Sequence, residues 1–370
     1  RLVDESVGFL APGSVERFRE DLGIGYTLAG AMIAAGAVGG ILANLLVAAS
    51  DGRSRKPVVV GGVHVTAIGL LVFAFAWNGA SLLVASALVA AGATGFVHGG
   101  EITILGVVPD ERLEHVLARA NLSAVAGDVL GPVVLAAARV AGMGWRTVFV
   151  AAAVVTVAYG LLLHRMPFPP PRPKRAHQDV ETGGGGSAMR RALVTVALVG
   201  VASLLIAPLD ESFLAVVLAF AERNHGFSPA GAAVLGVAFV GGGVLSFTVL
   251  PRLVARVSTG RLLMICGPGL AAVTVGTALA PSWALALLGV AHSALLGACW
   301  LGVQALSLRA MPGREGRALL VVEIIDTFSL VLIVALGALA DAAGLRAAIL
   351  GFAAVSAALT LPAMAFSRRA

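Results

Sequence analysis

The sequence predicts an all-α membrane protein, and three observations carry this prediction: an apolar composition, a scarcity of charge and repeated long apolar runs. Hydrophobic residues occupy 58% of the 370 positions, and charged residues only 12%. The mean hydropathy is +0.95. Because soluble domains carry about 25% charged residues, this chain lacks the polar surface needed to face water on all sides. Runs of about 20 apolar residues, the length of a membrane-spanning helix, recur from end to end.

Hydropathy, together with the Gly, Pro and charged residues that separate the apolar runs, predicts eleven long spans. We expect them at 27–49, 57–77, 80–108, 114–140, 145–164, 192–221, 229–255, 260–280, 282–310, 315–340 and 345–366. A shorter apolar stretch, Ser6 to Val15, follows two acids at the start of the chain. We interpret it as the end of a first span that is truncated at its N-terminus, which makes twelve spans.

Basic residues gather in alternate loops between these spans. Most of the 26 Lys and Arg residues lie in the loops after spans 2, 4, 8 and 10, in the central linker and at the C-terminus. The positive-inside rule therefore predicts a multi-pass protein of the cell membrane with both termini and the linker in the cytoplasm. The same distribution explains the sequence pI near 10.3 without a nucleic-acid partner.

The segment 166–191 is the longest polar stretch. It contains PFPPPRPK and then GGGGS at 183–187, a composition that cannot bury enough apolar surface to fold. We expect a flexible cytoplasmic linker between two six-span bundles, 1–165 and 192–370.

The two halves resemble each other in sequence. The triplet Asp4-Glu5-Ser6 recurs as Asp210-Glu211-Ser212, and the aligned halves place Glu101 opposite Gln304 and Asp128 opposite Asp326. We therefore predict two pseudo-symmetric, parallel six-helix repeats.

Such a repeat, together with the loop after the second span, resembles the major facilitator superfamily. The loop reads Asp51-Gly52-Arg53-Ser54-Arg55-Lys56. Asp51, Arg55 and Lys56 match the family's loop motif, whereas Val47, Gly52 and Ser54 stand where Gly, Arg and Gly are usual. The resemblance implies a monomeric secondary transporter rather than an enzyme, with no cofactor, in which this loop stabilises one of the alternating states. The charge rule alone would also account for a basic loop.

A second motif lies in the fifth span. Gly127, Gly131 and Pro132 are similar to the G-x-x-x-G-P core of the superfamily's proton antiporters, which favours export. Close helix packing at small residues and a bend at Pro would equally explain these residues. The stretch Phe18 to Gly30 and the run Gly95-Phe96-Val97-His98 resemble drug-efflux members of the fosmidomycin-resistance type.

Eight acids lie within apolar spans, where a charge costs at least about 2.5–3.5 kcal/mol. They are Asp4, Glu5, Glu101, Asp128, Asp210, Glu211, Glu323 and Asp326. The resemblance implies that their spans, 1, 4, 5, 7 and 11, line the central cavity. We add His98, one helical turn before Glu101, and Gln304 to this predicted site. No Lys or Arg lies mid-span beside these acids, so we expect a strongly negative cavity. Helix capping is the alternative role for the two Asp-Glu-Ser triplets.

The leading hypothesis is a proton antiporter that exports a small cationic or zwitterionic solute across the lipid bilayer. Clustered carboxyls in a partly dry cavity can take up and release protons near neutral pH. The alternative is a divalent-metal carrier with ligands from His98, Glu101, Asp128 and Asp326. A membrane sensor that has lost transport is a third possibility. The two cysteines, Cys266 and Cys299, lie in apolar runs and are interpreted as packing residues.

Overall fold

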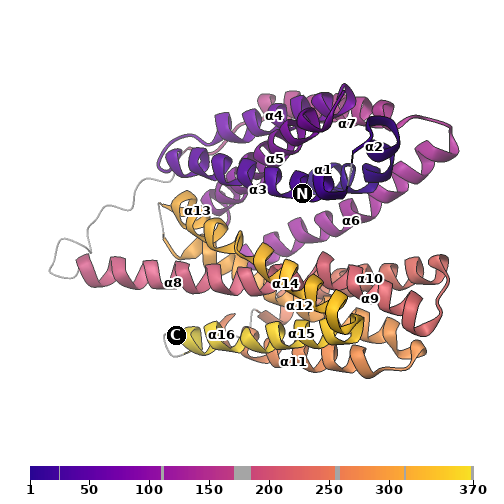
Figure 1. Cartoon of the computed structure of the whole chain (residues 1–370). Helices are drawn as coiled ribbons and strands as arrows, with labels where there is room; N and C mark the ends of the chain where they lie inside the picture. The colour runs from indigo at the N-terminus through magenta and orange to yellow at the C-terminus, as the bar shows by residue number, and fades with distance from the viewer. Residues whose placement is uncertain (25, 110–111, 171–184, 255–258, 312–313, 368–370) are drawn as a thin grey trace. The chain divides into compact units, whose positions relative to one another are not determined.

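Every regular element of this protein is a helix in the part of the chain that its structure describes (Figure 1). The structure is a computed structural model, and it describes residues 1–24, 26–109, 112–170, 185–254, 259–311 and 314–367. No strand occurs in these ranges, so the prediction of an all-α protein is confirmed.

The first half of the chain forms the following helices within the described ranges. They are α1 (Leu2–Gly8), η1 (Pro12–Ser14), α2 (Val15–Leu22), α3 (Tyr26–Ala49), α4 (Lys56–Ala74), α5 (Gly79–Val107), α6 (Leu113–Val140) and α7 (Trp145–Arg165).

The second half repeats this order with more interruptions. Its elements are α8 (Gly185–Ile206), η4 (Ala207–Leu209), α9 (Glu211–His225), α10 (Pro229–Val254), α11 (Thr259–Leu279), η5 (Ser282–Ala284), α12 (Leu285–Arg309), α13 (Glu315–Asp326), α14 (Ser329–Ala343), α15 (Leu345–Ala358) and α16 (Thr360–Ser367).

The predicted spans agree with these helices to within a few residues, but four of them are interrupted. The first span breaks between α1 and α2 at Pro12, and the seventh breaks at Pro208, because proline cannot donate the helical hydrogen bond. Spans 11 and 12 are interrupted after Asp326 and near Leu359. Helix α8 begins at Gly185, inside the predicted linker, and residues 171–184 of that linker lie outside the described residues.

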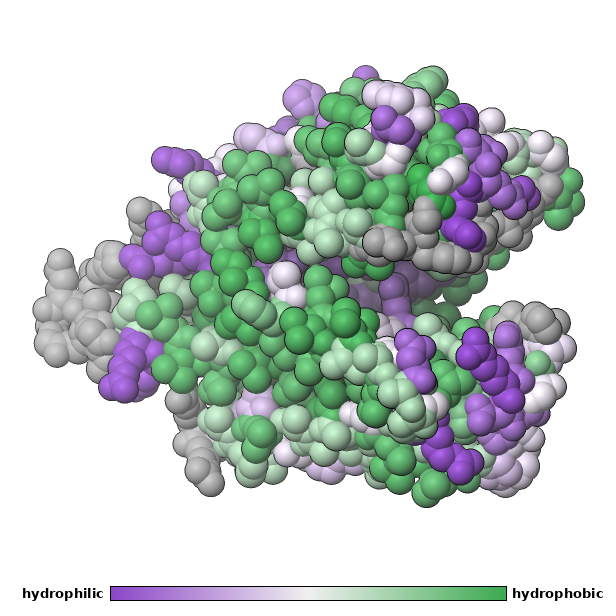
Figure 2. Space-filling view, viewed as in Figure 1, coloured by the Kyte–Doolittle hydropathy of each residue, from purple (hydrophilic) through white to green (hydrophobic). Residues whose placement is uncertain are grey.

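Nine helical segments in the described ranges are long and apolar enough to cross a membrane. Helix α10 has a shorter apolar stretch, Val234–Val249. Figure 2 shows hydrophobic side chains over much of the visible face, with hydrophilic residues gathered toward the helix ends. Large apolar side chains such as Ile33, Leu46 and Val155 are exposed, as expected where helices face lipid rather than water.

The chain divides into two compact units. Unit 1 comprises Arg1–Asp110, Ser123–Thr182 and Met311–Leu320, and unit 2 comprises Glu111–Leu122, Gly183–Ala310 and Val321–Ala370. The division runs through α6 and α13, so each unit takes a short segment from the other half of the sequence.

Each unit has its own aromatic core. In unit 1, Phe18, Phe73, Trp145 and Phe149 form a cluster with ring centroids 4.8–6.0 Å apart. The Trp145 indole N–H also donates to Asp21 Oδ2 at 2.6 Å, which fixes α7 beside α2. In unit 2, Phe213 packs against Phe239 and Phe352, which ties α9 to α10 and α15.

The antiporter-like glycines form the contact between α6 and α1 in unit 1. A Cβ atom at Gly127 would lie 2.6 Å from the Leu2 carbonyl oxygen and 2.8 Å from Glu5 Cβ. At Gly131 it would lie 2.8 Å from Phe9 Cβ. Only glycine permits this approach, so these residues bring α6 directly against the acid-bearing turn of α1.

We predict that Gly127→Val will destabilise unit 1, because the new side chain collides with the backbone of α1. Overpacking of this kind costs about 1–3 kcal/mol, which thermal unfolding in detergent can detect. Gly61→Val is the matched control, since a Cβ atom at exposed Gly61 meets nothing within 4 Å. Equal melting temperatures for the two variants would contradict the packing role.

Candidate functional site

An ion-pair network joins α1 to α5 in unit 1. The Arg1 guanidinium donates through Nη2 to Glu101 Oε1, and its Nη1 lies 3.9 Å from Glu5 Oε1. Glu101 is only 5% exposed, so the guanidinium neutralises a charge that burial would otherwise penalise. The expectation that no basic residue lies beside the acids is therefore wrong in unit 1. The sequence signal was the spacing of Arg1 and Glu5, which are one helical turn apart.

His98 is held by a residue that the sequence analysis missed. Its Nδ1 lies 2.7 Å from Oδ1 of Asn44, which is fully buried on α3. Because an amide oxygen only accepts, Nδ1 of His98 carries the hydrogen in this arrangement and Nε2 of the neutral ring keeps its lone pair. A lone Asn in an otherwise apolar span was the available signal.

Two further predicted acids, Asp4 and Asp128, also lie in unit 1. Asp4 is partly buried on α1, and Asp128 lies on α6 with its side chain exposed. Asp128 follows Gly127, so it lies one residue away from the α1–α6 contact. Pro132 lies within α6.

Asp210 and Glu211 lie where the seventh span is broken in unit 2. Asp210 has non-helical dihedral angles, φ −93° and ψ −116°, and both acids are exposed. The break leaves the Leu209 carbonyl without a helical partner, and His292 Nε2 lies 2.8 Å from that oxygen. A carbonyl only accepts, so Nε2 donates to it. Asp210 is the N-cap residue of α9, but its side chain makes no capping hydrogen bond, so the alternative role of helix capping is not supported for Asp210.

Both ring nitrogens of His292 have hydrogen-bond partners. The Thr274 hydroxyl lies 3.4 Å from its Nδ1, and the Phe213 ring stacks on the imidazole with centroids 4.0 Å apart. His292 is 1% exposed. The imidazole therefore joins α11, α12 and the broken span.

Glu323 and Asp326 lie on the last turn of α13, directly before the interruption of the eleventh span. The Thr327 N–H and hydroxyl both bond to the Glu323 carbonyl, at 2.9 and 2.8 Å, which tightens the backbone there. Oδ1 of Asp326 is buried and has no hydrogen-bond partner within the described ranges. No ion pair found among those residues involves either acid.

Gln304 on α12 pairs with another residue missed in the sequence. Asn121 Nδ2 donates to Gln304 Oε1 at 3.0 Å, within unit 2. The first half places the acid Glu101 at the repeat position of Gln304 and pairs it with a guanidinium. The second half has the amide side chain of Gln304 at this position and pairs it with the amide side chain of Asn121.

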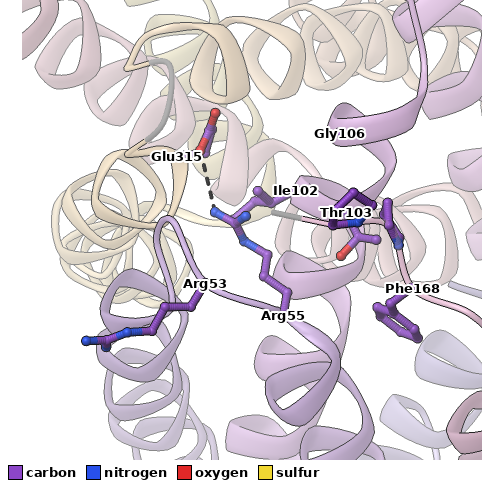
Figure 3. A pocket seen from close by; sticks show the side chains of 9 residues that line it. Arg53, Arg55, Ile102, Thr103, Gly106, Phe168 and Glu315 are labelled. Atoms are coloured by element: carbon purple, nitrogen blue, oxygen red, sulfur yellow. Dashed lines mark hydrogen bonds and ion pairs between the residues drawn. The ribbon is translucent and has the colours of Figure 1, made fainter. Parts of the chain in front are cut away.

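The loop after α3 docks onto the start of α13 within unit 1. Asp51 Oδ1 accepts from the Gly316 N–H at 3.0 Å, and Oδ2 accepts from the Arg317 N–H at 3.2 Å. Arg55 Nη2 donates to Asp51 Oδ1 at 2.9 Å and lies 3.5 Å from Glu315 Oε2. In Figure 3 the Arg55 side chain points toward Glu315, whereas Arg53 points away.

The docked loop is nearly closed to solvent. The Arg55, Asp51 and Glu315 side chains are 10%, 8% and 4% exposed. Burial raises the pKa of Asp51 above its ordinary value, and the N–H groups of Gly316 and Arg317 and the Arg55 charge oppose that rise. Asp51 and Arg55 were predicted, but their partners in the segment 315–317 were not.

Lys56, the third predicted loop residue, holds the start of the linker. Its Nζ donates to the Met166 carbonyl at 3.1 Å and lies 5.8 Å from the centre of the Phe168 ring. Phe168 also lines a small recess beside Arg55, together with Thr103 and Gly106 of α5.

The described residues contain no group of three or more His, Cys, Asp or Glu side chains that could hold a metal ion. His98 is engaged by Asn44, and Glu101 by Arg1. The metal-carrier alternative, which needed His98, Glu101, Asp128 and Asp326 as ligands, is therefore not supported.

Residues 6–207 match the model of the Major Facilitator Superfamily, and the chain belongs to this family. Its members are transporters rather than enzymes, so the protein is a multi-pass secondary transporter. No curated protein matches the sequence significantly.

Several solved transporters share the twelve-helix fold. The Escherichia coli fucose:proton symporter FucP is 16% identical with a TM-score of 0.72, over 98% of this chain and 95% of that one. The proton:xylose symporter XylE, bound to 6-bromo-6-deoxy-D-glucose, is 14% identical with a TM-score of 0.78, over 99% and 93%. A bacterial homologue of the iron transporter ferroportin is 17% identical with a TM-score of 0.72, over 100% and 98%.

We predict that Arg55→Ala will undock the loop, because it leaves Asp51 and Glu315 buried without their shared cation. Removing one partner of a buried ion pair costs about 3–5 kcal/mol. The amide protection of Gly316, measured by hydrogen exchange, should fall. Arg53→Ala is the control, since Arg53 is exposed and its Nη1 donates to the Ala49 carbonyl at the end of α3 rather than to α13. Unchanged Gly316 protection in Arg55→Ala would contradict this account.

We predict that His292→Phe will destabilise the protein by about 1–3 kcal/mol, because the ring stack survives but the buried Leu209 carbonyl loses its donor. Thermal unfolding measures the effect. Thr274→Val should cost less, since the Thr274 contact is long. A larger effect from Thr274→Val than from His292→Phe would reverse the roles assigned to the two residues.

Proposed function

We propose that this transporter is a proton-coupled antiporter of the cell membrane that exports a small cationic or zwitterionic solute by alternating access. It acts as a monomer without a cofactor, with both termini and the 166–191 linker in the cytoplasm. The two bundles, 1–165 and 192–370, are its repeats. Among family members, the proposal favours the drug:proton antiporters.

The observation that carries this proposal is the state of Asp326. Its Oδ1 is buried and lacks a partner at an interruption of a membrane-spanning helix. An unpaired carboxylate in such a place is costly, whereas a proton or a bound cation removes the cost. The carboxyl can therefore exchange one for the other. Transporters commonly build such sites where helices are discontinuous.

The other acids support a division of roles between the units. Glu101 and Glu5 share the Arg1 guanidinium, so one positive charge already offsets part of their negative charge. We assign this network, with His98 Nε2 as an acceptor, to binding the polar groups of the solute. Asp326, with Glu323 on the same helix face, is assigned to proton exchange. Asp128, Asp4, Asp210, Glu211 and Gln304 complete the proposed site.

The proposed proton coupling and the proposed direction of solute transport rest on separate observations. FucP and XylE are named as proton symporters, which supports proton coupling in this fold. The Gly127, Gly131 and Pro132 motif favours antiport over symport. The docked contact of Asp51, Arg55 and Glu315 supports the role of this loop in stabilising one transport state.

We predict that Asp326→Asn will abolish proton-driven transport while leaving the protein folded. The variant keeps the shape of the side chain but cannot exchange a proton. Transport of fluorescent organic cations into inverted vesicles, measured from about pH 5.5 to about pH 8.5, tests this. Asp341→Asn is the control, because Asp341 is an exposed acid on α14 of the same span. Full activity of Asp326→Asn at every pH would remove Asp326 from the mechanism.

A further inference from the structure

The only two cysteines of the sequence contact each other. Cys266 lies on α11 and Cys299 on α12, and the two thiols interact with each other. They are 3% and 0% exposed. The sequence has no third cysteine, so neither thiol can form a disulfide with any other residue of this sequence. Packing alone does not require both cysteines of a chain to meet on separate helices.

The pair belongs to a regular antiparallel contact between α11 and α12. Along this contact a Cβ atom at Gly269 would lie 3.2 Å from Leu295 Cδ1, and Thr274 bonds to His292. Cys266 precedes Thr274 by eight residues, and Cys299 follows His292 by seven. The thiol pair therefore lies on the same contact face as His292, about two helical turns, or about 11 Å, away.

Helix α11 contains a proline close to Cys266. Pro268 lies inside the helix, between Gly267 and Gly269. Proline lacks the N–H that would bond to the Met264 carbonyl, so one hydrogen bond of the helix is missing there. This local freedom lets Cys266 adjust to the narrow geometry that a disulfide requires.

We propose that Cys266 and Cys299 form a reversible disulfide that clamps α11 to α12. The oxidant is a small hydroperoxide that partitions into the membrane. One thiol sulfur attacks the peroxide oxygen, which gives a sulfenic acid and releases the alcohol. The second thiol then attacks the sulfenic sulfur, so that the S–S bond forms and water leaves. Two thiols lose two electrons and two protons, and the hydroperoxide is reduced to alcohol and water.

The disulfide has a defined consequence for the transport site. It fixes the register of α11 and α12, and thereby the position of His292 under the Leu209 carbonyl. That carbonyl marks the break next to Asp210 and Glu211. A clamp at this point restrains the broken span and slows alternating access. This consequence rests on the proposed transport function, whereas the disulfide itself does not.

The chemical test uses the full chain in lipid nanodiscs, treated with tert-butyl hydroperoxide. Peptide mass spectrometry should find one intramolecular cross-link between Cys266 and Cys299, lighter by two hydrogen atoms and reversed by a thiol reductant. Cys266→Ser and Cys299→Ser should each yield no intramolecular cross-link. Two thiols that stay separately alkylatable after oxidation and unfolding would overturn the proposal, and so would separate oxidation to sulfinic acids.

The functional test compares transport before and after the same treatment. Oxidised wild type should lose activity severalfold and recover it with reductant, whereas the double variant Cys266→Ala, Cys299→Ala should respond to neither. A cross-link that leaves wild-type transport unchanged would overturn the clamp. Absence of transport in untreated wild type would instead refute the proposed function, and the mass measurement would still decide whether the disulfide forms.

Discussion

The cost of an unsatisfied polar group inside a bilayer governs the arrangement of this protein. Water is absent from the hydrocarbon region, so each buried charge or free carbonyl needs a partner from the protein itself. Three contacts meet that need: Arg1 with Glu101, His98 with Asn44, and His292 with the Leu209 carbonyl. Each joins residues from different helices. The same contacts that remove an energetic penalty thus fix how the helices of each unit pack around the acids.

The two repeats meet this constraint differently. The first half keeps an acid at Glu101 and balances it with a guanidinium, while the second half has Gln304 and pairs it with Asn121. Glu323 and Asp326 are the contrast, since no ion pair found among the described residues involves them and one Asp326 oxygen has no partner. Symmetry of the backbone therefore does not extend to charge. The asymmetry supports assigning solute binding and proton exchange to different halves.

Hydropathy was sufficient to predict the spans, because helix length and apolar character are local properties of the sequence. The partners of the acids were not predictable, since they depend on how each helix is rotated about its axis. Asn44 and Asn121 were visible only as single amides in apolar runs, and Arg1 only as a cation one turn before Glu5. The break at Pro208 had a proline signal. The interruption after Asp326 had none, because Thr327 and Phe328 are compatible with a helix.

The loop after α3 explains one departure from the family pattern. Val47 stands where the motif usually has glycine, and a larger residue at a close helix contact would normally force the partners apart. In unit 1 the small residue at this contact is Gly316, on the opposing helix α13. A Cβ atom at Gly316 would lie 2.7 Å from the Val47 carbonyl oxygen and 2.8 Å from Ala48 Cα. Close approach requires a small residue on only one side of the contact, and here α13 provides it. The Gly316 N–H can then reach Asp51, so the ion pair and the close packing depend on the same residue.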